Sequence, residues 1–473
     1  MPSPSSFREA SGDGAARHSP SQPSVGALPR AGLYLLAGLL AGCAHYAPSP
    51  LPSPSVVLAA PDLRLITADA QKIDRPYLNP EPVNLATPLT PNDLAILAVL
   101  LNPDLKALRA KSGVTDAQAF AAGLLPDPTF QASFDKLLSG PDVYNGLAAQ
   151  IGFDLTQLRT RAVTRASGEA SKRQVRLDLA WAEWQAAGQA RLLGARVLSL
   201  TNQLSIALES ARSAEALFEV SSRAAGRGDI SGTDLDTRRQ AFLDASSKAR
   251  TAQHDLIAAR SDLNKELGLP PDIHLTLAPA KEPAPPPPAE LIVRRALSDR
   301  LDLQALKAGY EVAEAGLHVA ILEQFPNLSL TLASARDTAN NITVGPQVGF
   351  TLPLWNRNRG NIAIAGATRA QLKAEYEARL FQTRAEIVAA VAAIASERRQ
   401  RAEVLAQMPA MERYANRTKR AAARGDLSKA TAEAAAQAFR DRRLTLAQLD
   451  QQIAEQSIAL ELLSGGLSQG WGK

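Results

Sequence analysis

The stretch Arg227-Gly228-Asp229-Ile230-Ser231 decides the fold, because it returns almost unchanged as Arg424-Gly425-Asp426-Leu427-Ser428. The offset is 197 residues, and Ile151-Gly152-Phe153 returns at the same offset as Val348-Gly349-Phe350. A long segment is therefore duplicated with almost no insertions. Each copy is too long to be one unit of a solenoid, so it must be a half-protein that contains several elements.

The composition excludes several classes of protein. The chain has 473 residues, of which 45% are hydrophobic and 5% aromatic, a globular balance that favours close helix packing. The net charge is +5 with basic and acidic residues intermixed, so no nucleic-acid partner is expected. The five histidines lack metal-ligand spacing, and no phosphate loop or nucleophile elbow occurs. We therefore expect no enzyme activity, no metal site and no cofactor.

The amino terminus carries a processing signal. A short apolar run, Ala31 to Leu40, has the length of a signal-peptide core and is too short to span a bilayer. It ends in Leu40-Ala41-Gly42-Cys43, which resembles the bacterial lipobox, so residues 1–42 are predicted to be removed and Cys43 to be lipidated. The alternative, a buried free cysteine, fits poorly with the Pro/Ser-rich stretch that follows. Alanine after the cysteine resembles the signal for sorting to the outer membrane.

The remaining chain divides by composition and by the repeat. Each half is expected to open with a helix, residues 91–125 and 290–324, and Pro126 and Pro326 follow these helices. The predicted segments are a lipidated N-terminal tether at 43–90, a first repeat at 91–268, a Pro-rich connector at 269–290, a second repeat at 291–465 and a tail at 466–473.

Each half then shows two segments in which apolar residues alternate with small or polar ones. A period of two predicts strands, at residues 130–134, 147–155, 328–332 and 344–352. One predicted face carries Phe130, Phe134, Phe153, Leu330 and Phe350, and the other carries Gln131, Gln150, Thr331 and Gln347.

Two long helices complete each half. Apolar residues from Leu193 to Phe218 are spaced by alternating steps of four and three, which is a heptad pattern within a helix expected over 165–225. Its partner has an apolar residue every seven positions, and the copy repeats this stripe. The stripes are Leu235, Phe242, Ala249, Leu256 and Leu263, and Ala432, Phe439, Leu446, Ile453 and Leu460. Such long helices suit a coiled-coil cylinder.

Four strands cannot close a barrel, which needs about eight. If they enter a membrane, several copies must therefore share one barrel, since unpaired edges are not tolerated in lipid. The duplicated order of elements, the lipobox, the Asp-Leu-x-Ala-Leu helix start at 302–306 and the Gly-Asp-x-Ser tips resemble TolC-type outer-membrane efflux proteins. The resemblance covers nearly all of residues 90–465.

This resemblance implies a mainly α fold with a small β part. Duplicated halves of the type strand–strand–helix–helix would build a homotrimer with a twelve-stranded outer-membrane barrel, continued by a long helical periplasmic tunnel. The protein would pass solutes from an inner-membrane pump and a periplasmic adaptor to the outside. The run 352–361, Leu-Pro-Leu-Trp-Asn-Arg-Asn-Arg-Gly-Asn, further resembles the heavy-metal cation-efflux branch. Candidate solutes are thus metal cations or drugs. The alternative is a lipid-anchored periplasmic coiled-coil interaction protein without a pore, which leaves the matched strands unexplained.

The resemblance also implies site residues at the two turns between long helices. The adaptor would dock at tips formed by Arg227, Gly228, Asp229 and Ser231 and by Arg424, Gly425, Asp426 and Ser428. Carboxylates just after the tips would line a cation-attracting constriction. Asp234 matches that position in the first repeat, whereas Thr431 stands there in the second and Glu433 lies two residues on. An ordinary capping carboxylate remains the alternative reading of Asp234.

Overall fold

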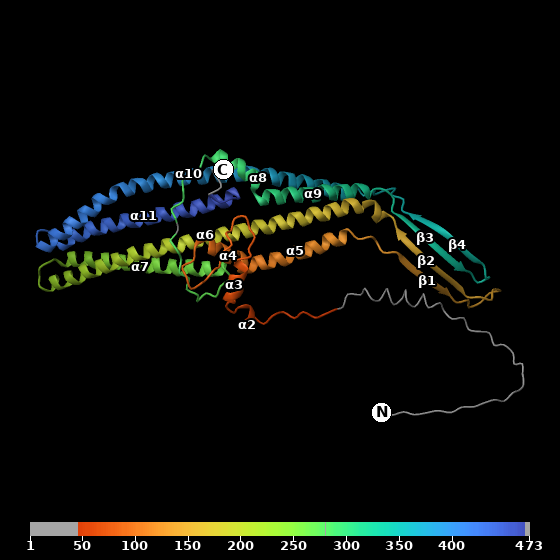
Figure 1. Cartoon of the computed structure of the whole chain (residues 1–473), viewed down its shortest axis with the longest axis horizontal. Helices are drawn as coiled ribbons and strands as arrows, with labels where there is room; N and C mark the ends of the chain where they lie inside the picture. The colour runs from red at the N-terminus through yellow and green to blue at the C-terminus, as the bar shows by residue number, and fades with distance from the viewer. Residues whose placement is uncertain (1–45, 280, 469–473) are drawn as a thin grey trace, which may run out of the picture. The chain divides into compact units, whose positions relative to one another are not determined.

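The computed structural model describes residues 46–279 and 281–468, so the predicted signal peptide and Cys43 lie outside the described residues. By contacts the chain falls into two units, residues 1–58 and 59–473. The described part of the first unit contains one short helix, α2 (Pro54–Val57). Both predicted repeats lie together in the second unit, in which long helices carry a small sheet at one end and two helical turns at the other (Figure 1).

The helices of the second unit follow the duplication. After α3 (Leu63–Ala70), the first repeat contains two shorter helices and two long ones, and the second repeat has the same order. The first set is α4 (Pro91–Leu101), α5 (Pro103–Ala122), α6 (Thr156–Gly226) and α7 (Gly232–Glu266). The second set is α8 (Ala289–Asp299), α9 (Leu301–Leu322), α10 (Arg359–Arg424) and α11 (Lys429–Ser464). Among the described residues, no helix combines the length and the apolar character needed to cross a membrane.

The single helix expected at the start of each repeat is wrong, because each is broken into two. In the first repeat Asn102 has a ψ of 123°, and Pro103 follows it. A proline disfavours the helical conformation of the residue before it and cannot donate the continuing hydrogen bond. Asn102 instead accepts hydrogen bonds from the backbone of Asp104 and Leu105 and so caps α5. In the second repeat Arg300 has a ψ of 122° without a following proline.

The four strands form one antiparallel sheet in the order β1-β2-β3-β4. Their bounds are β1 Thr129–Asp135, β2 Gly146–Asp154, β3 Leu328–Arg336 and β4 Ile342–Phe350. The central pair β2 and β3 comes from different repeats, so the sheet joins the two halves. Strands β1 and β4 are the edges. Alternation therefore predicted every strand, to within a few residues at each end.

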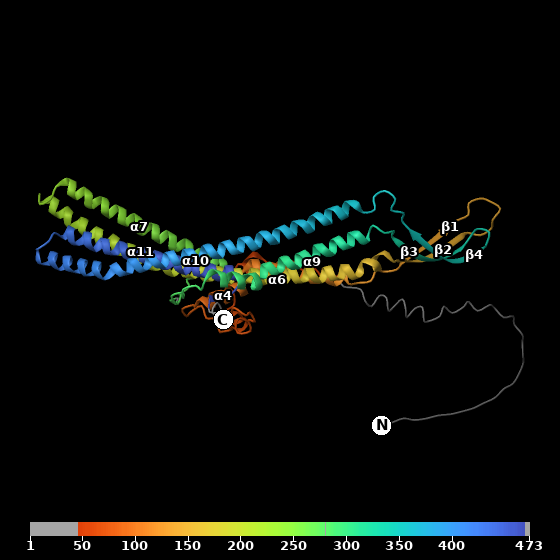
Figure 2. The same ribbon diagram turned by 90° about the horizontal axis from the view of Figure 1, so that it is seen from above.

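The core lies where the long helices pack against the shorter helices that open each repeat. Helix α6 packs against α4, α5, α7, α9 and α11, and α10 packs against α8, α9 and α11. The heptad stripes are partly or fully buried, with Leu263 and Ile453 each 2% exposed. Part of the segment expected to be a tether also contributes, because Ile66, Ala70 and Val83 are buried in this core. Figure 2 shows the pairs α6–α7 and α10–α11 running side by side toward their turns.

Candidate functional site: the sheet, the helical tips and the buried ion pairs

The sheet has two chemically different faces. Phe130, Ile151 and Leu332 are cross-strand neighbours, and Phe153, Leu330 and Val348 form a second apolar row. Most of these side chains are exposed, Phe130 by 72%. The strand register therefore confirms that the apolar residues predicted to share a face do so. An apolar face left open to solvent on an isolated sheet marks a surface that another phase or molecule covers.

The opposite face is small and polar. Gln131, Gln150 and Ala333 form one row, and Gln150 donates a hydrogen bond to the side-chain oxygen of Gln131. Gly152 and Gly349 occupy equivalent positions of the two repeats. A Cβ at Gly349 would lie 2.6 Å from the Ser329 hydroxyl oxygen, and one at Gly152 would lie 2.8 Å from that of Thr129. Glycine at both positions therefore leaves room for the hydroxyl groups of Ser329 and Thr129 on this face.

The two tips have the same backbone. Gly228 and Gly425 adopt φ values of 78° and 85°, a region that favours glycine. In each tip the residue after the glycine donates its N–H back to the helix, Asp229 to Ala224 O and Asp426 to Ala421 O, both at 2.9 Å. This pattern closes a helix with a left-handed residue. A Cβ at either glycine would meet nothing within 4 Å, so only backbone strain opposes substitution.

The predicted tip side chains mostly stabilise the turns themselves. Arg227 donates to Asp229 and Arg424 to Asp426, in both cases over 2.9 Å. Ser231 accepts the N–H of Asp234 at 3.1 Å, and Ser428 accepts that of Thr431 at 3.0 Å, so each serine caps the helix that follows. All eight residues are exposed.

The two gate candidates differ in their surroundings. Asp234 is exposed and accepts a hydrogen bond from the Ser231 hydroxyl at 2.7 Å, so its carboxylate belongs to a capping arrangement. Glu433 instead forms an ion pair with Arg440, whose side chain is only 7% exposed. Arg440 therefore offsets the charge of Glu433, whereas Asp234 has no basic partner among the described residues.

The chain around the two tips also differs in charge. Residues 412–443 carry nine basic and four acidic side chains, a net charge of +5. The equivalent residues 215–246 carry four basic and six acidic side chains, a net charge of −2. A cavity of about 350 Å³ lies between the helix pair α6–α7 of the first repeat and α11 of the second. Its polar lining includes Arg238, Asp244, Glu433 and Arg440.

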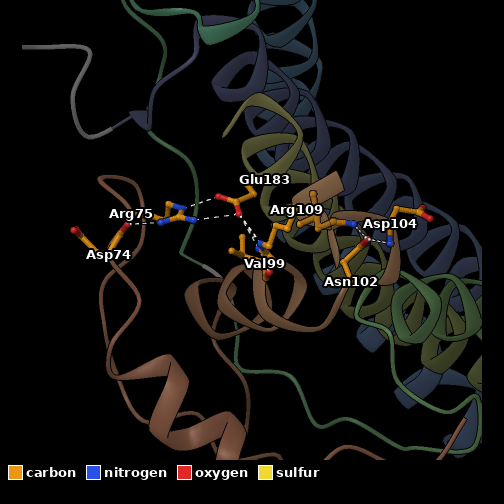
Figure 3. A network of polar contacts seen from close by, with 8 residues as sticks. Asp74, Arg75, Val99, Asn102, Asp104, Arg109 and Glu183 are labelled. Carbon is orange, nitrogen blue, oxygen red and sulfur yellow. Dashed lines mark hydrogen bonds and ion pairs between the residues drawn. The ribbon is translucent and has the colours of Figure 1, made fainter. Parts of the chain in front are cut away.

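A buried carboxylate that sequence reasoning missed joins three segments near the first helix break (Figure 3). Glu183 of α6 is 1% exposed and accepts hydrogen bonds from Arg75 at 2.6 Å and 3.1 Å. Arg109 of α5 donates to the same carboxylate at 2.7 Å and also to the carbonyl of Val99, in the last turn of α4. Burial alone would raise the pKa of Glu183, but the hydrogen bonds from Arg75 and Arg109 outweigh it and lower the pKa.

The second repeat has a comparable cluster at its own helix break. Asp302 accepts hydrogen bonds from Arg300 at 2.7 Å and from Arg379 at 2.9 Å. Burial raises and these arginines lower the pKa of Asp302, and the net shift is downward. Gly268 and Gly465, again 197 residues apart, both have positive φ and lie against the two breaks. The recurrence of this glycine at the 197-residue offset is the feature of the sequence that could have indicated the two helix breaks. Among the described residues, no group of three or more potential metal ligands occurs.

The duplicated helices and the four-stranded sheet share their fold with outer-membrane channels of known structure. Residues 292–466 match the model of the outer membrane efflux protein family. The crystal structure of the outer membrane channel CmeC from Campylobacter jejuni is similar with a TM-score of 0.66 and 16% identity, covering 80% of this chain and 85% of CmeC. The outer membrane protein VceC from Vibrio cholerae gives a TM-score of 0.64 and 15% identity, covering 80% and 96% of the two chains.

A curated relative adds a more specific similarity. The cobalt-zinc-cadmium resistance protein CzcC of Cupriavidus metallidurans is 25% identical over 293 residues, which are 61% of this chain and 69% of CzcC. The resemblance to TolC-type outer-membrane efflux proteins is thereby confirmed, since the second repeat matches the model of that family. The matched family is one of efflux channels and not of enzymes.

Proposed function

We propose that this chain is the outer-membrane channel of a tripartite efflux system, and that three copies assemble around one pore. The observation that carries the proposal is the sheet, which has two free edges and one exposed apolar face. Three such sheets joined edge to edge give twelve strands, which is enough to close a barrel without unpaired edges. The apolar face would contact lipid, and the glutamine and glycine face would line a wet lumen.

The helical part extends this pore on the periplasmic side. Four long helices from each copy would give a wall of twelve. The tips at 227–231 and 424–428 would form its mouth, where an adaptor protein docks and an inner-membrane pump delivers the solute. The opposite charges of the two tips favour an adaptor surface that is itself charged, with its acidic part at the second-repeat tip. Asp234 would be the carboxylate that faces cations at the mouth.

Similarity to CzcC and the run 352–361 favour divalent metal cations as the exported solute. The proposed lipid on Cys43 would hold the amino terminus at the membrane, in addition to the barrel itself.

The test of membrane integration uses two neighbouring residues at the centre of β3. Leu332 lies on the apolar face and Ala333 on the polar face. An arginine facing lipid near the midplane costs about 2–4 kcal/mol, whereas a lumen arginine is solvated. We expect Leu332→Arg to abolish the detergent-stable trimer and Ala333→Arg to preserve it. If the wild type forms no such trimer, and if Cys43→Ser alone releases the protein from the membrane, the pore-free coiled-coil alternative is correct.

A further inference from the structure

The segment between β4 and α10 is chemically unlike its counterpart in the first repeat. In the first repeat a single residue, Leu155, separates β2 from α6. In the second repeat eight residues, 351–358, separate β4 from α10. We call residues 351–359 the junction loop. Its sequence is Thr-Leu-Pro-Leu-Trp-Asn-Arg-Asn-Arg, and the proposed function gives its exposed side chains no role.

The junction loop exposes large apolar side chains. Trp355 is 86% exposed, Leu352 64% and Leu354 58%. By contrast, Trp184 in the core is 2% exposed. Leu352 and Leu354 continue the period of two set by Val348 and Phe350, although β4 ends at Phe350. The apolar surface of the sheet therefore runs past the last strand residue toward the helices.

Two cationic side chains follow directly. Arg357 and Arg359 are exposed, and neither guanidinium has an ion pair or hydrogen bond with any of the residues that the structure describes. Most other arginines close to the sheet are engaged. Arg159, for example, donates to the carbonyls of Phe325 and Pro326. The junction loop therefore has an apolar part, formed by Trp355 and the two leucines, and a cationic part, formed by the two unpaired arginines.

The backbone holds this surface in one conformation. Arg357 and Asn358 have φ values of 48° and 54°, which side chains other than glycine adopt at some cost. Asn358 offsets that cost, since its amide donates to Ala320 O at 2.8 Å and to Glu323 at 3.3 Å. At the other end, the Thr351 hydroxyl accepts the N–H of Asn327 at 3.1 Å. The loop is thus fixed to α9 and to Asn327, the residue before β3, while Trp355, Arg357 and Arg359 are exposed.

We propose that the junction loop is a lipid-binding surface for the periplasmic headgroup layer, with Trp355 at the interface and Arg357 and Arg359 binding lipid phosphates. This inference rests on the proposed function, because the loop continues the face that contacts lipid. Tryptophan is enriched at membrane interfaces, since its ring is apolar and its N–H is polar. Arginine binds phosphate through a planar pair of N–H donors. Only the second repeat carries the loop, so a trimer would have three such contacts.

The test uses the full chain in vesicles of phosphatidylcholine and phosphatidylglycerol whose acyl chains carry bromine, which quenches tryptophan emission on contact. The emission assigned to Trp355 is the difference between the wild type and Trp355→Phe. We expect bromine near the headgroup to quench this emission more than bromine at the chain end, and aqueous iodide to quench it little. Strong quenching by iodide and none by lipid would overturn the proposal.

A reporter on the sheet separates this inference from the proposed function. Phe153→Trp in the Trp355→Phe background places a tryptophan on the apolar face. If that reporter is quenched by lipid and Trp355 is not, the junction loop proposal fails while the channel stands. If neither is quenched, the sheet is not in the membrane and both fail.

The arginines are tested by lipid selectivity. We expect brominated phosphatidylglycerol to associate with Trp355 more strongly than brominated phosphatidylcholine, by about fivefold for each nearby arginine. Arg357→Gln with Arg359→Gln should remove that preference. The matched control is Arg413→Gln with Arg417→Gln, two exposed arginines of α10 that lie more than fifty residues along the chain from the junction loop. Equal selectivity in both double variants would show that the loop arginines do not bind the lipid phosphates.

Discussion

At the scale of single residues, Glu183 is a buried carboxylate that joins three segments of the chain. It is 1% exposed and is held by Arg75 and Arg109, which are themselves 39% and 33% exposed. If the carboxylate is lost, the partly exposed guanidinium groups of Arg75 and Arg109 can be hydrated by solvent. A neutral side chain at position 183 cannot accept the hydrogen bonds of both arginines as the carboxylate does. Glu183 thus ties residues 59–90 to α5 and α6.

The first prediction concerns Glu183→Gln. Hydrogen bonds to a charged group contribute about 1.5–3 kcal/mol each, but part of the loss is regained by hydration of the arginines. We expect a net decrease of roughly 1–3 kcal/mol in the free energy of unfolding of the membrane-extracted protein, measured by denaturant titration. Glu219→Gln, an exposed carboxylate on the same helix, should change it by less than about 0.5 kcal/mol.

The second prediction is the pH dependence of that difference. Because the folded pKa of Glu183 lies below its ordinary value of about 4.3, the stabilisation is fully present above that pH. It is lost as the pH falls through the lower folded pKa. The wild type and Glu183→Gln should therefore converge in stability in acid. A difference that is constant between pH 7 and pH 3 would contradict the assignment.

The third prediction concerns Cys43, which lies outside the described residues. Cys43→Ser should abolish labelling with a radioactive or clickable fatty acid. Labelling of the serine variant at the level of the wild type would show that the lipobox reading is wrong. Efflux is expected to persist, because the barrel is proposed to hold the protein in the membrane independently.

At the scale of elements, the helical turns are determined by backbone geometry. Gly228→Ala and Gly425→Ala each introduce a Cβ at positive φ, which costs about 1–2 kcal/mol but meets no neighbouring atom. We expect the double variant to form trimers while losing adaptor binding, measured by co-purification with the adaptor. Gly226→Ala lies in the adjacent helical turn, where a Cβ also meets nothing, and is the matched control. Unchanged adaptor binding in the double variant would remove the tips from the docking site.

The gate prediction follows from the two carboxylates after the tips. Asp234 is free of basic partners in the described chain, whereas Glu433 is paired with Arg440. Asp234→Asn should reduce block of the pore by multivalent cations added from the periplasmic side, and Glu433→Gln should change it little. Block that survives in Asp234→Asn and disappears in Glu433→Gln would move the constriction to the second repeat.

Much of this architecture could be predicted from local pattern. The alternation around Gln150 and Thr331 fixed both the strands and their faces, because a slip of one residue would exchange the faces. Pro103 is compatible with a new helix that starts there and is the local signal for the break at Asn102. The break at Arg300 has no proline after it, so no local pattern predicts it. The Glu183 cluster joins residues 75, 109 and 183, and no local pattern reports a contact over such separations. The junction loop was read only as a family signature, because its exposure is a property of the fold.

At the scale of the whole molecule, the account depends on how the two free edges of the sheet are used. Strand β1 and strand β4 both present unpaired backbone groups, which is unfavourable in lipid unless another copy pairs with them. A membrane-spanning strand needs about 9–11 residues. Strand β4 has nine residues and meets this length, whereas β1 has seven and is shorter. Assembly is therefore expected to be inseparable from membrane insertion, with no stable inserted monomer.

The most direct measurement is the conductance of the purified protein in a planar lipid bilayer, together with that of Leu332→Arg and Ala333→Arg. The account predicts discrete channel events for the wild type, events with altered conductance or ion selectivity for Ala333→Arg, and few or none for Leu332→Arg. Ala333 lies on the face that would line the lumen, and Leu332 on the face that would contact lipid. A wild-type protein that forms trimers without conducting, or two variants that are impaired equally, would contradict the proposal that this sheet is one third of a pore.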